Sequence, residues 1–328
     1  MPGFTTHYII GIKSLSEFPP GAFQDVLKQH RYIYQLGLQG PDIFFYNIPL
    51  ARHRNHRNIG VFMHEAHIET FFRTLFLAIS DIEDDQKRGQ AIAYAAGYIC
   101  HYVGDSIIHP YVYARIGHDP KQKGSEKSRT TSLHCQLEND IDAILLYRYR
   151  QKRPSEFNQA TSILLSPSEK KFLSQFLSSV ITKAYYPSIY DKKYYVSPGV
   201  VARSIWATQI GCRMLSDPLE RKKQKINYIE TLLGRSPIVS NKLVTDSISD
   251  MRWALNSEHE YWANPWDRSL VSSQSFPELF QIALGKCRDC FFQLSQLSEK
   301  PLPWSEEDIR PLLTVLGNYS FHSGLPVG

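Results

Sequence analysis

One helix-length segment constrains this 328-residue chain more than any other feature of its sequence. Residues 87–109 form a nearly continuous apolar run that includes most of the stretch "YICHYVGDSIIHPY", residues 98–111. A helix that is apolar on all sides is typical of the centre of a bundle. His101, Asp105 and His109 follow at four-residue intervals and therefore share one side of that helix. Buried imidazole and carboxylate groups need partners, and a metal ion could serve all three.

A second four-residue pair follows in "HCQLE", where His134 and Glu138 again lie on one helix face. Their nitrogen and oxygen atoms are suitable zinc ligands. Taken alone, either motif is explained equally well by a hydrogen-bonded core histidine or a capping contact. Because the two motifs lie within 38 residues, together they favour metal binding.

Apolar periodicity predicts an all-α protein, a multi-helix bundle with additional C-terminal helices. Residues 1–150 are expected to form a metal-binding helical domain, and residues 151–328 a helical extension packing on it. The polar stretch 118–132 predicts a loop, Pro110 is expected to end the central helix, and "KYYVSP" is the one candidate strand. The predicted helices cover residues 21–36, 59–80, 87–109, 133–149, 168–184, 198–215, 218–234, 238–257 and 275–297.

Composition argues against several classes of protein. The formal charge of +5 is too small to indicate nucleic-acid binding by itself. No run reaches the roughly 18 to 20 apolar residues of a membrane-spanning helix, and the first residues do not resemble a secretion signal. Five scattered cysteines argue against a disulfide framework, so a reducing cytoplasm is expected.

Other candidate ligands lie nearer the N-terminus. Asp42 follows a Gly-Pro turn in "GLQGPD", a position that also suits a simple turn aspartate. His64 lies on the apolar stripe of the 59–80 helix and is a better candidate than the more peripheral His67. His7 is isolated, and such a histidine is more often structural. The basic stretch "ARHRNHRN", 51–58, could attract a phosphate or simply be solvated.

Taken together, these motifs resemble the zinc-dependent phospholipase C family, whose fold is shared by trinuclear-zinc nucleases. The resemblance covers roughly residues 2–145 and is strongest in "GYICHYVGDSIIHP" and "HCQLENDID". It implies three zinc sites. One would use Asp42, His64, His101 and Asp105; a second His7, Asp105 and the chain's N-terminal amine; and a third His109, His134 and Glu138.

Two features differ from the family pattern. Three residues separate Asp105 from His109, where characterised secreted members have five. The N-terminal tryptophan of those members is also missing, although removal of Met1 would expose Pro2 five positions before His7. The resemblance therefore implies two or three zinc ions.

The expected function is a zinc-dependent phosphoester hydrolase in which the metals activate water and Asp42 orients or deprotonates it. The substrate would be a phospholipid headgroup or a soluble phosphoester, with a single-stranded nucleic acid a lesser alternative. Two alternative functions are not enzymatic: a metal-stabilised scaffold and a basic nucleic-acid-binding protein. The oligomeric state does not follow from the sequence.

Overall fold

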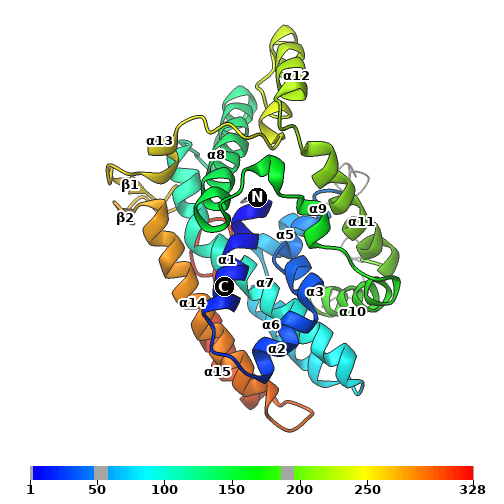
Figure 1. The fold of residues 1–328 in the computed structure, drawn as a ribbon. Coiled ribbons are helices and arrows are strands. Elements are labelled where there is room, and N and C mark those ends of the chain that lie inside the picture. The colour runs from blue at the N-terminus through cyan, green and yellow to red at the C-terminus, as the bar shows by residue number, and fades with distance from the viewer. Residues whose placement is uncertain (1–2, 48–57, 186–195, 328) are drawn as a thin grey trace.

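The computed structural model describes residues 3–47, 58–185 and 196–327. These residues form an all-α bundle with one two-stranded ribbon, which confirms the predicted fold class (Figure 1). The N-terminal helices are α1 (Phe4–Glu17), α2 (Ala22–Gln29), α3 (Arg31–Gly37), η1 (Gly40–Phe44), α5 (Ile59–Glu65), α6 (Ile68–Ser80), α7 (Asp85–Arg115) and α8 (Gly124–Arg150). The later elements are η2 (Pro154–Glu156), α9 (Gln159–Ser162), α10 (Pro167–Tyr185), α11 (Pro198–Leu215), α12 (Arg221–Leu232), η4 (Ser240–Lys242), α13 (Met251–Leu255), β1 (Trp262–Ala263), β2 (Val271–Ser272), α14 (Phe276–Ser298) and α15 (Glu306–Leu316).

Helix α7 is the axis of the bundle, as its apolar sequence predicts. Nearly every side chain from Gly89 to Val112 is buried. Helices α1, α2, α3, α6 and α14 pack around it, and α8 and β1 also contact it (Figure 1). His101, Asp105 and His109 are therefore surrounded by protein on all sides.

Helices α3 and α7 contact each other closely, and two glycines make this approach possible. A Cβ atom on Gly97 would lie 2.1 Å from the carbonyl oxygen of Tyr34, and one on Gly37 would lie 2.3 Å from that of Tyr94. Neither position therefore accommodates a side chain unless the helices separate. This contact sets the position of η1, which follows α3 directly and carries Asp42.

The start of α1 is held by a side chain from α8. The Asp142 carboxylate accepts hydrogen bonds from the backbone N–H groups of Thr5 and Thr6, at 3.0 and 2.7 Å, and from the Thr6 hydroxyl at 2.6 Å. It thereby caps the first turn of α1 from another helix. The cap fixes the turn that carries His7.

One hydrophobic cluster includes residues from both sides of residue 150, from Phe4 to Phe321. Helix α14 packs along α7, and α15 packs against α14 and α6. The last described residues, 318–327, fold back as a hairpin in which Val327 N donates to Asn318 O at 2.9 Å and Ser320 N donates to Leu325 O at 2.9 Å. We call residues 318–327 the C-terminal hairpin. The domain boundary expected near residue 150 stays a prediction.

Two predicted helix boundaries are wrong. Pro110 does not end the central helix, which continues to Arg115, because packing of α7 against the surrounding helices outweighs the local cost of the proline. The stretch 118–132 is not all loop, because α8 begins at Gly124. Ser128 and Thr131 donate their hydroxyl hydrogens to carbonyls four residues earlier, so the helix itself satisfies these polar side chains.

Three predicted helices are interrupted. Residues 21–36 divide at His30 into α2 and α3, which both pack on α7. Residues 59–80 divide where Ala66 is extended and His67 is left-handed, with φ of 54°. Residues 238–257 contain only η4 and α13. Asn241 forms hydrogen bonds with Asn139 and Ser132 of α8, and these replace the bonds of a continuous helix. Helices α1 and α15 were not predicted from the sequence.

Some predictions fall outside the described residues: a ligand role for Pro2, the basic stretch 51–58 apart from Asn58, and the first half of the candidate strand "KYYVSP". The second half, residues 196–198, is not a strand, because Ser197 caps α11 and Pro198 begins that helix. In the ranges that are described, every helix is too short or too polar to cross a lipid bilayer. The five cysteines are all free.

The contact between α3 and α7 predicts that Gly97→Ala will be strongly destabilising. The added methyl group must push the two helices apart, which costs about 1–3 kcal/mol or more. Gly285→Ala is the matched control, because a Cβ atom at this position in α14 meets only Arg288 Nη2, at 3.8 Å. The control should be neutral or stabilising by up to about 1 kcal/mol. Urea unfolding measures both; equal stability of the two variants would contradict the packing argument.

Candidate metal centre

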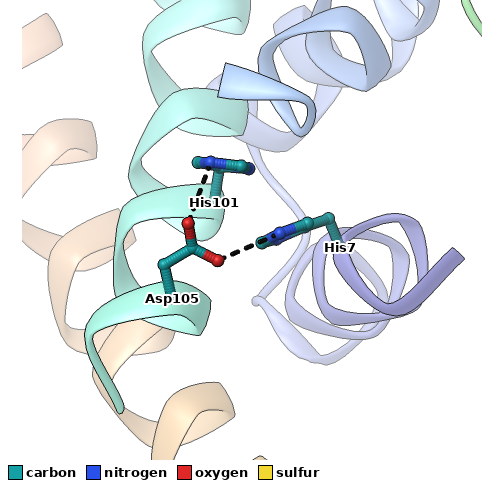
Figure 2. Close-up of side chains that lie close together, drawn as sticks. All are labelled: His7, His101 and Asp105. Carbon is teal, nitrogen blue, oxygen red and sulfur yellow. Dashed lines mark ion pairs between the residues drawn. The ribbon is translucent and has the colours of Figure 1, made fainter. Parts of the chain in front are cut away.

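Asp105 lies at the centre of a cluster of four histidines, with none of its side chain exposed. One carboxylate oxygen is 3.1 Å from His7 Nε2, and the other is 3.2 Å from His101 Nε2. Figure 2 shows His7 reaching Asp105 from α1, while His101 lies one turn before it on α7. His64 Nε2 and His109 Nδ1 are farther away, at 3.6 and 3.7 Å. Helices α1, α5 and α7 thus meet at one carboxylate.

Asp42 and His64 join His101 to form a second group. His64 Nε2 is 3.3 Å from Asp42 Oδ1, and one donor atom from each of the three residues lies within 4.8 Å of the others. The short 3-10 helix η1 supplies Asp42, and the last turn of α5 supplies His64. The break after α5 leaves His67 exposed at a turn, so His64 is the histidine that the fold brings to the cluster.

His109, His134 and Glu138 form a third group, again with donor atoms within 4.8 Å of one another. His134 Nε2 is 2.5 Å from Glu138 Oε1, as their four-residue spacing on α8 predicts. His109 Nε2 approaches the same oxygen at 3.8 Å. His134 and Glu138 are 8% and 7% exposed, which makes this group the least buried part of the centre.

Backbone carbonyls orient three of these histidines. In each ring Nδ1 lies against a carbonyl oxygen, which can only accept, so Nδ1 carries the proton and Nε2 is left for another partner. Such outer contacts are typical of metal-bound histidine. The three contacts are His64 with Gly60 O at 2.6 Å, His101 with Leu38 O at 3.1 Å, and His109 with Phe321 O at 2.8 Å.

Several polar atoms at the centre have no hydrogen bond within the described part of the chain. They are His7 Nδ1 and Nε2, Asp42 Oδ1, His101 Nε2, both carboxylate oxygens of Asp105, and His109 Nε2. Buried atoms of this kind are costly and rare in a native protein. They converge on common points, and imidazole nitrogen and carboxylate oxygen are the donors that zinc takes in catalytic sites. The residues therefore fit bound zinc.

The electrostatics of the centre also suit a cation. Burial raises the pKa of Asp105, but His101, His109 and His7 more than offset this and hold it well below its ordinary value. Burial lowers the pKa of His134 to about 4, so the ring is neutral at neutral pH. Burial, reinforced by nearby His7, also lowers the pKa of His101. An ionised carboxylate and neutral imidazoles are the protonation states that bind metal.

His64 is the exception. Burial acts to lower its pKa, but the adjacent carboxylates of Asp105 and Asp42 outweigh burial and raise the pKa to about 9. Without a metal, this ring therefore holds a proton on Nε2 that a metal ion would have to displace.

The C-terminal hairpin supplies contacts that sequence reasoning missed. Its Phe321 donates N–H to the carbonyl oxygen of His64 at 3.1 Å and accepts from His109, so it bridges two parts of the centre. His322 stacks on His64, with ring centroids 5.2 Å apart and an interplanar angle of 15°, and its ring lies 5.8 Å from that of His109. The only signal for His322 in the sequence is that it is one of two histidines after residue 134.

The structure brings all eight residues predicted as ligands into this one cluster, although whether each binds a metal stays a prediction.

Comparison with known proteins agrees with this geometry. A family model described as zinc dependent phospholipase C matches residues 6–186, which is more than half of the chain. The matched span contains every candidate ligand from His7 to Glu138. The predicted family is therefore confirmed. No curated protein and no solved structure gives a significant match to the chain.

Zinc binding is expected to release a proton from His64 at any pH below about 9. This folded-state pKa exceeds the ordinary value of 6.5, so the protonated ring stabilises the metal-free protein fully below about 6.5. That contribution is lost as the pH rises through about 9, while the apparent zinc affinity rises by up to about ten-fold per pH unit. Calorimetric titration near neutral pH, in two buffers of different ionisation heat, measures the released proton.

His67→Gln is the control for this titration, because His67 is exposed and should not alter proton release. Zinc binding with no proton release by the wild-type protein would contradict the assignment.

The C-terminal hairpin predicts a loss of metal affinity in Gly324→Ala. Gly324 has φ of +62°, and an added Cβ atom would lie 2.5 Å from Ser106 O and 2.9 Å from Pro110 Cγ. The hairpin must then shift, which removes the Phe321 carbonyl from His109. Loss of such an outer contact typically costs about 10- to 100-fold in metal affinity.

Competition with a chromogenic chelator measures that affinity. Gly199→Ala is the control, because its added Cβ atom meets only Ser197 Oγ, at 3.8 Å. If Gly324→Ala bound zinc as tightly as this control, the hairpin would not be part of the centre.

Proposed function

The chain belongs to the zinc-dependent phospholipase C family, and from this premise we propose that it is a zinc-dependent phosphoester hydrolase. The observation that carries the proposal is the convergence of eight buried histidine and carboxylate side chains around Asp105 within the matched span. A scaffold would need only one metal site to stabilise its fold. Three ligand groups side by side support hydrolysis of a phosphoester instead.

We assign the ligands in three groups. His7, His101 and Asp105 form the first; Asp42, His64 and His101 the second; and His109, His134 and Glu138 the third. His101 belongs to two groups, and Asp105 contacts histidines of all three. These shared residues would keep two or three zinc ions close together. Bound zinc supplies Lewis-acid catalysis, lowering the pKa of a coordinated water and neutralising charge on phosphoryl oxygens.

Asp42 is the proposed proton acceptor. Burial raises its pKa, but the nearby imidazole rings of His64 and His101 outweigh burial, so the pKa lies below its ordinary value. The carboxylate is therefore ionised at neutral pH and can orient a water molecule or accept its proton. Its Oδ1 atom, which has no hydrogen bond within the described residues, is the atom proposed for this contact.

The remaining residues position this chemistry and exclude water from it. The carbonyl oxygens of Leu38 and Gly60 hold His101 and His64 in one ring orientation. Phe321 packs edge-on against His64, with centroids 4.9 Å apart, and so provides an apolar wall. We propose residues 1–150 as the metal-binding domain and residues 151–328 as an extension that packs on it and closes the centre with the C-terminal hairpin.

The proposed substrate class is a phosphoester, with a phospholipid headgroup as the form that the family name suggests. A soluble phosphoester is the alternative substrate for the same chemistry.

Metal content and turnover test the proposal together. The purified protein is expected to contain two or three zinc ions and to hydrolyse a chromogenic phosphocholine ester, with chelation abolishing turnover and added zinc restoring it. Asp42→Asn should lower turnover by at least about 100-fold while zinc stays bound to the other groups. The exposed carboxylate Asp25 provides the control, Asp25→Asn, which should be fully active.

Zinc bound without turnover of any phosphoester would favour the scaffold reading. A protein that binds no zinc would contradict both readings.

A further inference from the structure

Helix α12 projects from the body of the protein (Figure 1, top of the view). Its principal packing partner among the described elements is η4. Of its twelve residues, only Glu230 is buried. A helix with so little contact to its own fold has nearly all of its surface available to a partner.

The exposed surface at the end of α12 is apolar. Tyr228, Ile229, Leu232 and the following Leu233 are 65%, 53%, 67% and 60% exposed. Single exposed apolar residues are common, but four large ones on one projecting turn form a contiguous patch, and such a patch marks an interaction site.

The same helix carries unpaired cations. Its only acidic residue is the buried Glu230, whereas Arg221, Lys222 and Lys225 are exposed. None of the three has an ion pair with a carboxylate among the described residues, although Lys222 Nζ donates to Ser216 O at 2.8 Å. Its exposed charge is therefore uniformly positive.

Helical geometry places cations and apolar residues on one outward stripe. Successive residues of a helix are rotated by about 100°, so residues spaced three or four apart share one side. The side opposite Glu230 carries Arg221, Lys225, Tyr228 and Leu232. The stripe begins with positive charge and ends with apolar side chains.

The side of α12 that carries Glu230, opposite this stripe, is fixed to the body of the protein. The Glu230 carboxylate accepts from Val239 N at 2.8 Å and from the Ser240 hydroxyl at 2.6 Å, which ties α12 to η4. The η4 segment is bonded in turn to α8, where Asn139 Nδ2 donates to Asn241 O at 2.6 Å. Asn139 is adjacent to the ligand Glu138, so α12 is joined to the centre by two short hydrogen-bonded steps.

We propose that α12 together with Leu233 is a docking surface for an anionic phospholipid bilayer. The apolar end would enter the boundary between headgroups and acyl chains, while Arg221, Lys222 and Lys225 contact lipid phosphates. The combination favours a lipid surface over nucleic acid, which would match the cations but not the apolar end. Such docking would hold the phosphohydrolase centre beside lipid headgroups. It therefore extends the proposed function, on which it depends for the reaction.

Vesicle flotation of the metal-loaded protein tests the surface. Vesicles of phosphatidylcholine alone are compared with equimolar phosphatidylcholine and phosphatidylglycerol. The wild-type protein should float with the anionic vesicles, and less so at high salt. For the triple variant Ile229→Ser/Leu232→Ser/Leu233→Ser, the fraction of protein bound to the vesicles should be at least about ten-fold lower than for the wild-type protein. The variant Arg221→Glu/Lys225→Glu should lose the preference for anionic vesicles.

Ile282→Ser/Phe292→Ser is the matched control, because these residues of α14 are also exposed, at 46% and 53%. It should float like the wild-type protein. Absence of flotation by the wild-type protein, or equal flotation of the triple variant, would overturn the proposal. So would a wild-type dimer, seen by sedimentation, that the triple variant dissociates, because α12 would then be an interface between copies of the chain.

Turnover of a soluble chromogenic phosphoester separates this proposal from the proposed function. All of these variants should retain that turnover, since none changes a residue of the metal centre. Flotation without turnover of any phosphoester would leave docking supported and the hydrolase assignment wrong. Turnover without flotation would leave the hydrolase assignment supported and docking wrong.

Discussion

The whole arrangement depends on one carboxylate, Asp105, which is fully buried among imidazole rings. Both of its oxygens have histidine nitrogens within about 3 Å but no hydrogen bond of acceptable geometry within the described residues. Burying a negative charge in this position costs much free energy unless positive charges lie close to it. In the metal-free protein the protonated ring of His64 contributes one such cation. Bound zinc would place a fixed positive charge beside this carboxylate. The buried negative charge of Asp105 therefore favours metal binding.

Elements far apart in the sequence hold the rings around Asp105. The glycine contact between α3 and α7 brings in the Leu38 carbonyl and Asp42, and the capping of α1 by Asp142 brings in His7. The C-terminal hairpin contributes the Phe321 carbonyl from the other end of the chain. Rigid support of this kind is what keeps several ligands within bonding distance of common points. It also explains why α7, on which three of the candidate ligands lie, is so completely enclosed.

The sequence predicted the class of fold and the central cluster because both depend on local spacing. Four-residue steps place His101, Asp105 and His109 on one side of a helix whatever surrounds them. It could not predict His322 or the Phe321 carbonyl, because their approach depends on a chain reversal over 200 residues away from α7. The break at His67 and the continuation of α7 through Pro110 were also missed, since tertiary packing overrides local preference at both places. Residues such as Asp142, whose role is to cap another helix, leave no mark in a local pattern.

The most direct test of the central claim is anomalous diffraction from crystals of the zinc-loaded protein, recorded on both sides of the zinc absorption edge. Two or three peaks, with two beside Asp105 and the third among His109, His134 and Glu138, are the predicted result. A map without peaks at these positions would contradict the account, because the buried histidines and carboxylates would then have to be satisfied by protons and hydrogen bonds alone.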